Sequence, residues 1–165
     1  MTRWVVDASP LIFLTKLDRL DLLRRGADEI LVPSEVVAEI SAGRDDSAGQ
    51  VSRALGTWLR ERPFALRDLP PILKTAGPGE AAAMLLAQQV DADRIVMDDL
   101  NARRRARALG LDPVGTLGLL LAARLRDEIP CLRDEIARLR AAGFRVGDAL
   151  VQAVLAEAGE GGPGR

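Results

Sequence analysis

Short apolar runs alternate with longer amphipathic stretches along most of the chain. The apolar runs lie at residues 3–7, 30–32, 64–66, 94–97 and 113–114. Each is too short for a helix and apolar enough for a strand that is buried on both sides. Helical periodicity fills the stretches between them. This alternation predicts an α/β fold, in which a short central parallel sheet carries helices on both faces.

The helices are predicted by their apolar spacing, by Ser or Pro at their starts and by Gly near their ends. They are expected at residues 9–23, 33–40, 51–62, 78–90, 100–109, 116–126, 130–143 and 146–158. The stretch 41–50, rich in Gly, Asp and Ser, is expected to be a loop. We expect one domain over residues 1–158 and a disordered, Gly-rich tail over residues 159–165.

The first of these helices has an apolar face made of leucines. Leu11, Leu14, Leu17 and Leu20 follow one another at helical spacing. Such a face serves either the core of the domain or the seam of a dimer, and we favour the core.

Composition limits the classes of protein that the chain can form. Of its 165 residues 48% are apolar, which excludes a disordered chain, and the net charge of -1 excludes a strongly basic surface overall. Any contact with nucleic acid must therefore come from a local patch. A single cysteine, Cys131, fits a reducing cytoplasm, and we expect no signal peptide and no membrane segment.

Carboxylates stand where two of the predicted strands end. Asp7 follows the run 4–6, and Asp98 and Asp99 follow the run 95–97. In an open α/β sheet the functional crevice lies at the carboxyl ends of the strands. Carboxylate oxygens gathered there are the ligands that Mg²⁺ or Mn²⁺ prefers. The chain has no histidine, so a zinc-type or histidine-based site is not expected.

Each of these acids could instead serve only to stabilise the start of the helix that follows it. Asp7 precedes a helix, but Ser9 is the better cap, which leaves Asp7 without a structural task. Either Asp98 or Asp99 could cap the helix that follows them. We expect Asp99 to bind a cation and Asp98 to support it.

Two glutamates on predicted helices complete the acidic set. Glu39 lies beside the buried stripe of its helix, and Glu80 stands at the start of another, where the macrodipole favours an acid. Neither glutamate indicates a metal site by itself. The prediction rests on four acids that recur at strand ends and at the starts of adjoining helices.

Short motifs follow one another along the chain in a recognisable order. They are VVDASPLI at 5–12, PSEVVAEI at 33–40, GPGEA at 77–81, IVMDDLNAR at 95–103, GTLGLL at 115–120 and GFRVGDAL at 143–150. Together they resemble the PIN-domain family of metal-dependent nucleases, in particular its toxin-type (VapC-like) subgroup. The resemblance covers about residues 3–158 and implies a single PIN-like domain.

The resemblance implies hydrolysis of RNA phosphodiester bonds with Mg²⁺ or Mn²⁺ as cofactor, chemistry that needs no histidine or cysteine nucleophile. It implies Asp7, Glu39, Glu80 and Asp99 as the catalytic acids, with Asp7, Asp98, Asp99 and Glu80 as metal ligands. Asp7 and Asp99 are then the central ligands. Ser9 and Thr116 are expected to hydrogen-bond a ligand or the scissile phosphate.

An arginine run directly follows the last of these acids. Helical spacing places Arg103 and Arg107 on one face near the crevice, where their forked donors suit phosphate oxygens. We expect them to bind RNA, although a solvated helix face explains the run equally well.

The toxin-type resemblance also implies a partner, a small antitoxin protein that inserts a basic side chain into the acidic pocket. We further expect a homodimer. The alternative to a nuclease is an inactive PIN-like scaffold that binds protein or RNA and keeps the acids as relics. Metal binding that depends on Asp7 and Asp99 would distinguish the two.

Overall fold

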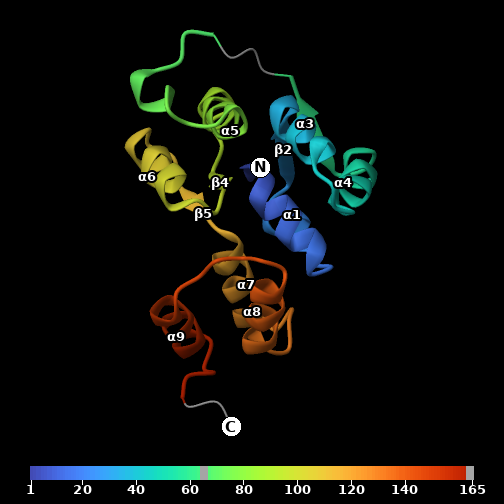
Figure 1. Cartoon of the computed structure of the whole chain (residues 1–165), viewed down its shortest axis with the longest axis vertical. Coiled ribbons are helices and arrows are strands. Elements are labelled where there is room, and N and C mark those ends of the chain that lie inside the picture. Colours follow the sequence, from blue (N-terminus) through green and yellow to red (C-terminus); the bar gives the residue numbers. More distant parts are fainter. Residues whose placement is uncertain (64–66, 163–165) are drawn as a thin grey trace.

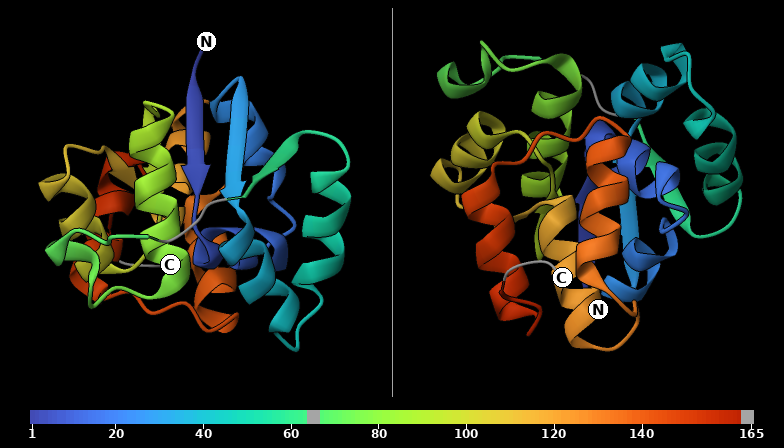
Figure 2. Two further views of the ribbon diagram at one scale, coloured as in Figure 1. Left: turned by 90° about the horizontal axis from the view of Figure 1, so that it is seen from above. Right: turned by 60° about the horizontal axis from the view of Figure 1, so that its bottom comes forward.

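A parallel sheet lies at the centre of the computed structural model, which describes residues 1–63 and 67–162. Within these residues five strands pair in the order β3-β2-β1-β4-β5, all of them parallel (Figures 1 and 2). They are β1 (Arg3–Val6), β2 (Glu29–Pro33), β3 (Leu59–Arg62), β4 (Arg94–Val96) and β5 (Pro113–Val114). The predicted α/β fold with a short parallel sheet is confirmed.

Helices cover both faces of the sheet, as expected (Figure 2). They are α1 (Ala8–Lys16), α2 (Asp21–Gly26), α3 (Ser34–Ala42), α4 (Ser47–Leu55), α5 (Pro78–Gln89), α6 (Leu100–Ala108), α7 (Thr116–Leu125), α8 (Leu132–Ala141) and α9 (Asp148–Glu157). The 3₁₀ turn η1 (Pro71–Leu73) precedes α5. Helices α5 and α6 pack on one face, whereas α1, α2, α7 and α8 pack on the other.

The strands supply side chains to both apolar layers in strict alternation. Val5 pairs in register with Leu31 and Ile95, and all three point toward α5 and α6. Their neighbours Trp4 and Val6 point to the opposite layer. Because these side chains of the three central strands are buried, each contributes apolar burial, about 1.5–3 kcal/mol for a fully buried aliphatic side chain.

The leucine face of α1 belongs to this core. Leu11 and Leu14 are fully buried and Leu17 is 1% exposed, so the preference for core over dimer seam is confirmed for these three residues. The continuous helix predicted through Leu23 is wrong. Helix α1 ends at Lys16 and a second helix, α2, follows, because Asp18 takes a left-handed backbone conformation with φ 55°, which a helix cannot contain.

The region between residues 41 and 62 also differs from the prediction. Helix α4 begins inside the expected loop and ends at Leu55, and the last residues of the expected helix form the edge strand β3. Only Leu59 of β3 is buried, and its other three residues are charged and exposed. Charged side chains on an edge strand hinder pairing with other chains, and they hide the apolar signal of a strand. The strand expected at 64–66 lies outside the described residues.

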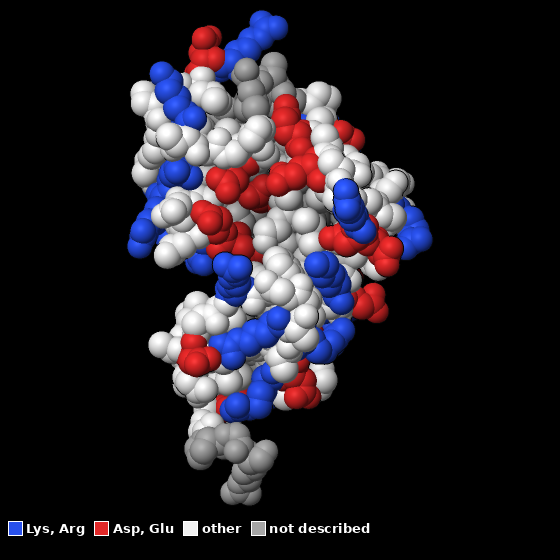
Figure 3. All heavy atoms as spheres, in the orientation of Figure 1, with Lys and Arg blue, Asp and Glu red and all other residues white. Residues whose placement is uncertain are grey.

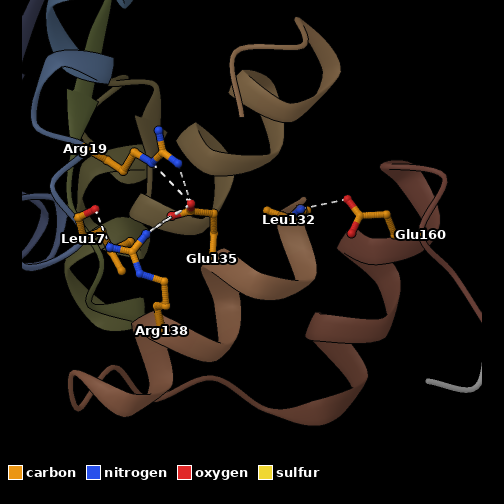
Figure 4. A network of polar contacts seen from close by, with 6 residues as sticks. All are labelled: Leu17, Arg19, Leu132, Glu135, Arg138 and Glu160. Carbon is orange, nitrogen blue, oxygen red and sulfur yellow. Dashed lines mark hydrogen bonds and ion pairs between the residues drawn. The ribbon is translucent and has the colours of Figure 1, made fainter. Parts of the chain in front are cut away.

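A buried carboxylate on α8 connects this helix to the turn that follows α1. Glu135 is 4% exposed and accepts hydrogen bonds from Arg19 Nη2 at 2.7 Å and Arg138 Nη1 at 3.3 Å (Figure 4). Arg138 also donates to the carbonyl of Leu17 at 2.9 Å. These bonds fix the position of α8 beside the turn between α1 and α2. None of the helices in the described residues is both long and apolar enough to span a bilayer.

Candidate active site

A pocket of about 960 Å³ lies at the carboxyl ends of β1, β2 and β4. Six carboxylates line it, and they come from the junction of β1 and α1, from α3, from α5 and from the loop after β4. They are Asp7, Glu35, Glu39, Glu80, Asp98 and Asp99. Figure 3 shows acidic side chains gathered on this face of the molecule, in the region of α3 and α5. The four acids predicted to be catalytic therefore lie around one pocket.

Asp7 is the most buried of these acids, with 7% of its surface exposed. Its backbone N–H donates to Val96 O at 2.9 Å, which fixes it beside β4. Its Oδ1 accepts from the N–H of Ala8 at 2.8 Å, so Asp7 caps α1. The prediction that Ser9 caps this helix is wrong: Asp7 has the extended backbone of a cap residue, and Ser9 already lies inside the helix.

The environment of Asp7 favours its neutral form. Burial raises the pKa of Asp7 to about 7, against the opposing effect of the hydrogen bond from Ala8, and the nearby charges of Glu80, Glu39 and Asp98 raise it further. An ionised Asp7 therefore lacks a compensating positive charge. A bound cation would supply one.

Asp98 is held in place by hydroxyl and backbone donors. Its Oδ1 accepts from Thr116 N at 2.7 Å, and its Oδ2 accepts from Thr116 Oγ1 and Ser9 Oγ, each at 2.8 Å. Asp99 is exposed and uses Oδ1 to cap α6 through the N–H of Ala102 at 2.8 Å. Ser9 and Thr116 thus fix Asp98, while the second oxygen of Asp99 faces no protein donor in the described residues.

Glu80 stands in the first turn of α5, as predicted. Burial raises its pKa and the charge of Asp99 raises it further, whereas Arg105 lowers it. Arg105 Nη1 lies 3.8 Å from Glu80 Oε2, and its Nη2 donates to Thr75 Oγ1 at 3.2 Å. Arg105 was not predicted as a site residue, although it belongs to the arginine run, because only the packing of α6 against α5 shows which member reaches an acid.

Glu39 approaches α5 closely because residue 79 has no side chain. A Cβ placed on Gly79 would stand 2.5 Å from Glu39 Oε2. One turn earlier on α3, Glu35 also lines the pocket, and its buried Oε2 has no hydrogen-bond partner in the described residues. Glu35 was not predicted, because a lone glutamate in the first turn of a helix is ordinary.

The two predicted RNA-binding arginines have different positions. Arg103 Nη1 and Asp98 Oδ1 lie 3.5 and 3.1 Å from where a Cβ on Gly115 would stand, so both flank the same glycine. Arg103 is half-buried beside the site. Arg107 is exposed on α6, and neither arginine is among the described residues that line the pocket.

Part of the pocket wall is formed by residues for which the sequence predicts no role. Phe13 of α1 lines it together with Phe144 and Arg145 from the segment between α8 and α9. The segment 143–150 was noted only as a motif. The chain has only three phenylalanines. A partly exposed phenylalanine is therefore unusual in this protein, and this rarity is the signal that could have identified Phe13 and Phe144.

The pocket suits a hard divalent cation by its chemistry, although its ligands are not assembled around one point. It offers carboxylate oxygens, and the buried oxygen of Glu35 lacks a partner. Among the described residues, however, no three acidic side chains stand where they would hold one ion together. Binding would therefore involve rotation of Glu80 and Asp99, neither of which is fully buried, toward the fixed Asp7.

The fold and this pocket define a class of protein. The chain belongs to the PIN-domain family: a model of the PIN domain matches residues 3–160. PIN domains are generally nucleases that use divalent metals such as Mg²⁺.

Among solved structures, the chain is similar to a PilT N-terminus domain protein, SSO1118, from the hyperthermophilic archaeon Sulfolobus solfataricus P2. The identity is 19%, the match covers 74% of this chain and 93% of that one, and the TM-score is 0.50. This likeness supports the fold alone. No curated protein matches the sequence.

Proposed function

We propose that the protein is a Mg²⁺- or Mn²⁺-dependent ribonuclease that hydrolyses RNA phosphodiester bonds. The observation that carries the proposal is Asp7, a buried carboxylate with a pKa raised to about 7, in a pocket lined by five further acids. Like charges gathered in a partly desolvated site are unfavourable without a cation. Their presence at the carboxyl ends of the strands, in a PIN domain, supports a catalytic role.

Asp7, Glu80 and Asp99 are the residues that would hold the metal. When bound, it would lower the pKa of water and offset charge on the phosphoryl group. The remaining tasks belong to the protein. Ser9 and Thr116 hold Asp98 in place beside Asp7 through their hydroxyl groups, and Arg105 restrains Glu80.

Glu39 is the group best placed to accept a proton from the attacking water. It is exposed, it lines the same pocket, and no hydrogen bond from a described residue occupies its carboxylate. Gly79 leaves it room beside α5. Neither histidine nor a cysteine nucleophile is needed for this chemistry.

Cleavage of labelled nucleic acid tests the proposal. A pool of structured RNAs and a single-stranded DNA are incubated with Mn²⁺ or Mg²⁺, with EDTA, and with the Asp7→Asn variant. Asp127→Asn is the matched control, because Asp127 is exposed and has a left-handed backbone that asparagine tolerates. We expect RNA cleavage by wild type and Asp127→Asn, and none with EDTA or with Asp7→Asn. Equal cleavage by Asp7→Asn would overturn the site.

Within this proposal the protein is the toxin of a toxin–antitoxin pair. The support is the toxin-type character of its motifs and an acidic pocket that suits a basic side chain of an antitoxin. Expression in a bacterial host should arrest growth, and Asp7→Asn should abolish the arrest. Growth unaffected by an active, soluble nuclease would contradict the toxin role and leave the nuclease proposal intact.

A further inference from the structure

We propose that Phe144 and Arg145 form a nucleotide-binding subsite at the rim of the acidic pocket. In this subsite the ring of Phe144 stacks on a nucleobase, and the guanidinium of Arg145 binds a phosphate next to the scissile one. The inference rests on the proposed nuclease function. It adds two residues, apart from the acids, that bind the RNA substrate.

The backbone that carries these two residues is braced at both ends. Just beyond the end of α8, Gly143 has φ +99°, and the N–H of Phe144 donates to Leu139 O at 3.1 Å. On the far side, Arg140 Nη2 donates to Val146 O at 2.9 Å and to Asp148 Oδ1 at 2.8 Å. The segment between α8 and α9, which crosses over α7 in Figure 1, is therefore held in one position. A held segment binds a ligand without a large loss of conformational entropy.

Phe144 is presented to the pocket by an aromatic neighbour. Its ring meets that of Phe13 edge to face, with centroids 5.0 Å apart and planes at 90°. Both rings are partly exposed and both line the pocket. Two of the three phenylalanines in the chain thus stand beside the acids. Nucleobases stack on such rings whatever their identity.

The guanidinium group of Arg145 is not bonded to other described residues. It is exposed, and none of the hydrogen bonds or ion pairs among the described residues involves it. It is the one basic residue among the described residues that line the pocket, against six carboxylates. A polyanionic substrate is repelled by those acids, so a cationic group at the rim is where its phosphates would bind. The forked donors of arginine suit phosphate oxygens.

The base-stacking half of the proposal is tested by scanning one abasic nucleotide along a short RNA that wild type cleaves with Mn²⁺. For wild type, we expect one position near the cleaved bond to raise KM about tenfold when its base is removed. For Phe144→Leu, which keeps an apolar side chain for the core, removing that base should have no further effect. Thermal unfolding of the variant confirms that it is folded.

The phosphate half is tested by Arg145→Gln, with Arg145→Lys as the charge-retaining variant. The matched control is Arg24→Gln, because Arg24 is exposed on α2, which precedes β2 and so lies at the opposite end of the strands. We expect Arg145→Gln to raise KM several-fold with kcat little changed, and to reduce the salt dependence of KM by about 0.7 in logarithmic slope. Arg145→Lys should restore the slope, and Arg24→Gln should leave both unchanged.

The outcomes separate the subsite from the nuclease proposal. Cleavage that is insensitive to abasic position, with the same salt slope in Arg145→Gln, overturns the subsite and leaves the nuclease intact. If wild type does not cleave, binding of the labelled RNA is measured instead. Binding that Phe144→Leu and Arg145→Gln both weaken then supports the subsite while the nuclease fails, and binding unaffected by either variant overturns the subsite too.

Discussion

At the residue scale, Asp7 has two roles that conflict at neutral pH. It caps α1 through Ala8, yet burial and three neighbouring acids hold its pKa near 7. A carboxyl group whose pKa is raised in the folded state binds its proton more tightly there than in the unfolded chain. The free energy of unfolding therefore decreases as pH rises from about 4 to about 7, and the loss is complete above that range.

Asp7→Asn removes this conflict, because an asparagine oxygen still accepts the hydrogen bond from Ala8 and carries no charge. In metal-free buffer at pH 8 we expect the variant to gain about 1–2 kcal/mol in unfolding free energy, or roughly 2–6 °C in Tm. At pH 5, where Asp7 is largely protonated, the gain should shrink. Differential scanning calorimetry at the two pH values measures it. A gain that is the same at both would show that charge burial at Asp7 is not its origin.

Gly79→Ala should lower the cleavage activity without lowering the stability of the fold. The added methyl group meets Glu39 Oε2, the far end of a flexible side chain, so Glu39 moves rather than α5. Alanine in place of glycine inside a helix stabilises it by about 0.5–1 kcal/mol. We expect Tm to be unchanged or higher while metal-dependent cleavage falls at least tenfold, about 1.4 kcal/mol in transition-state stabilisation.

Gly49→Ala is the matched control for this variant. Gly49 lies in α4, and nothing stands within 4 Å of where its Cβ would be. It should show the same helix stabilisation and no change in cleavage. Full activity in Gly79→Ala would show that the position of Glu39 does not matter for the reaction.

The sequence predicts some site residues and not others for a physical reason. Asp7 follows β1 directly and Asp99 is the third residue after the neighbouring strand β4, so sheet topology alone brings them to one edge. Glu35 and Arg145 reach the pocket, and Arg105 reaches Glu80, through the packing of one element against another, which no local pattern encodes.

At the scale of elements, the end of the chain holds the start of α8. Glu160 accepts from the N–H of Leu132 at 2.8 Å (Figure 4). It also accepts from the N–H of Arg133 at 3.1 Å and from Arg124 Nε at 3.0 Å. Burial alone would raise the pKa of Glu160, but these hydrogen bonds lower it to about 2. The carboxylate thus acts as an N-terminal cap for α8 that comes from a distant part of the chain.

Glu160→Gln should reveal this cap through its pH dependence. A lowered pKa means that the stabilisation is present above the ordinary value, about 4.5, and is lost as pH falls toward 2. Above pH 5 we expect the variant to lose up to about 2 kcal/mol of unfolding free energy. Urea unfolding at pH 6 and pH 3 measures the difference, which should be smaller at pH 3. An equal loss at both pH values would indicate packing rather than charge as the cause.

Elements with a strong apolar signal were predicted well, and those without one were not. Strands β1, β2 and β4 are buried on both faces and appear in the sequence as continuous apolar runs. Strand β3 lies at the sheet edge with mostly charged residues, so its sequence looks like the end of a helix. The break between α1 and α2 depends on one left-handed aspartate, Asp18, and aspartate also occurs within helices.

At the scale of the whole molecule, the net charge of -1 hides an uneven distribution. Acidic side chains gather around the pocket, and basic side chains border that region over the part of the molecule that holds α7 and α8 (Figure 3). A bound cation and the rim arginine would together make the pocket accessible to a polyanion. The overall architecture could be predicted from the alternation of strands and helices in the sequence. The distribution of charge over the surface could be seen only in the folded structure.

The most direct test of the account is the rate of RNA cleavage as a function of Mn²⁺ concentration for wild type, Asp7→Asn and Asp127→Asn. We predict a rate that rises with Mn²⁺ to a plateau for wild type and Asp127→Asn, and no cleavage at any Mn²⁺ concentration for Asp7→Asn. Cleavage that is independent of Mn²⁺, or that Asp7→Asn retains, would contradict the assignment of this pocket as a metal-dependent active site.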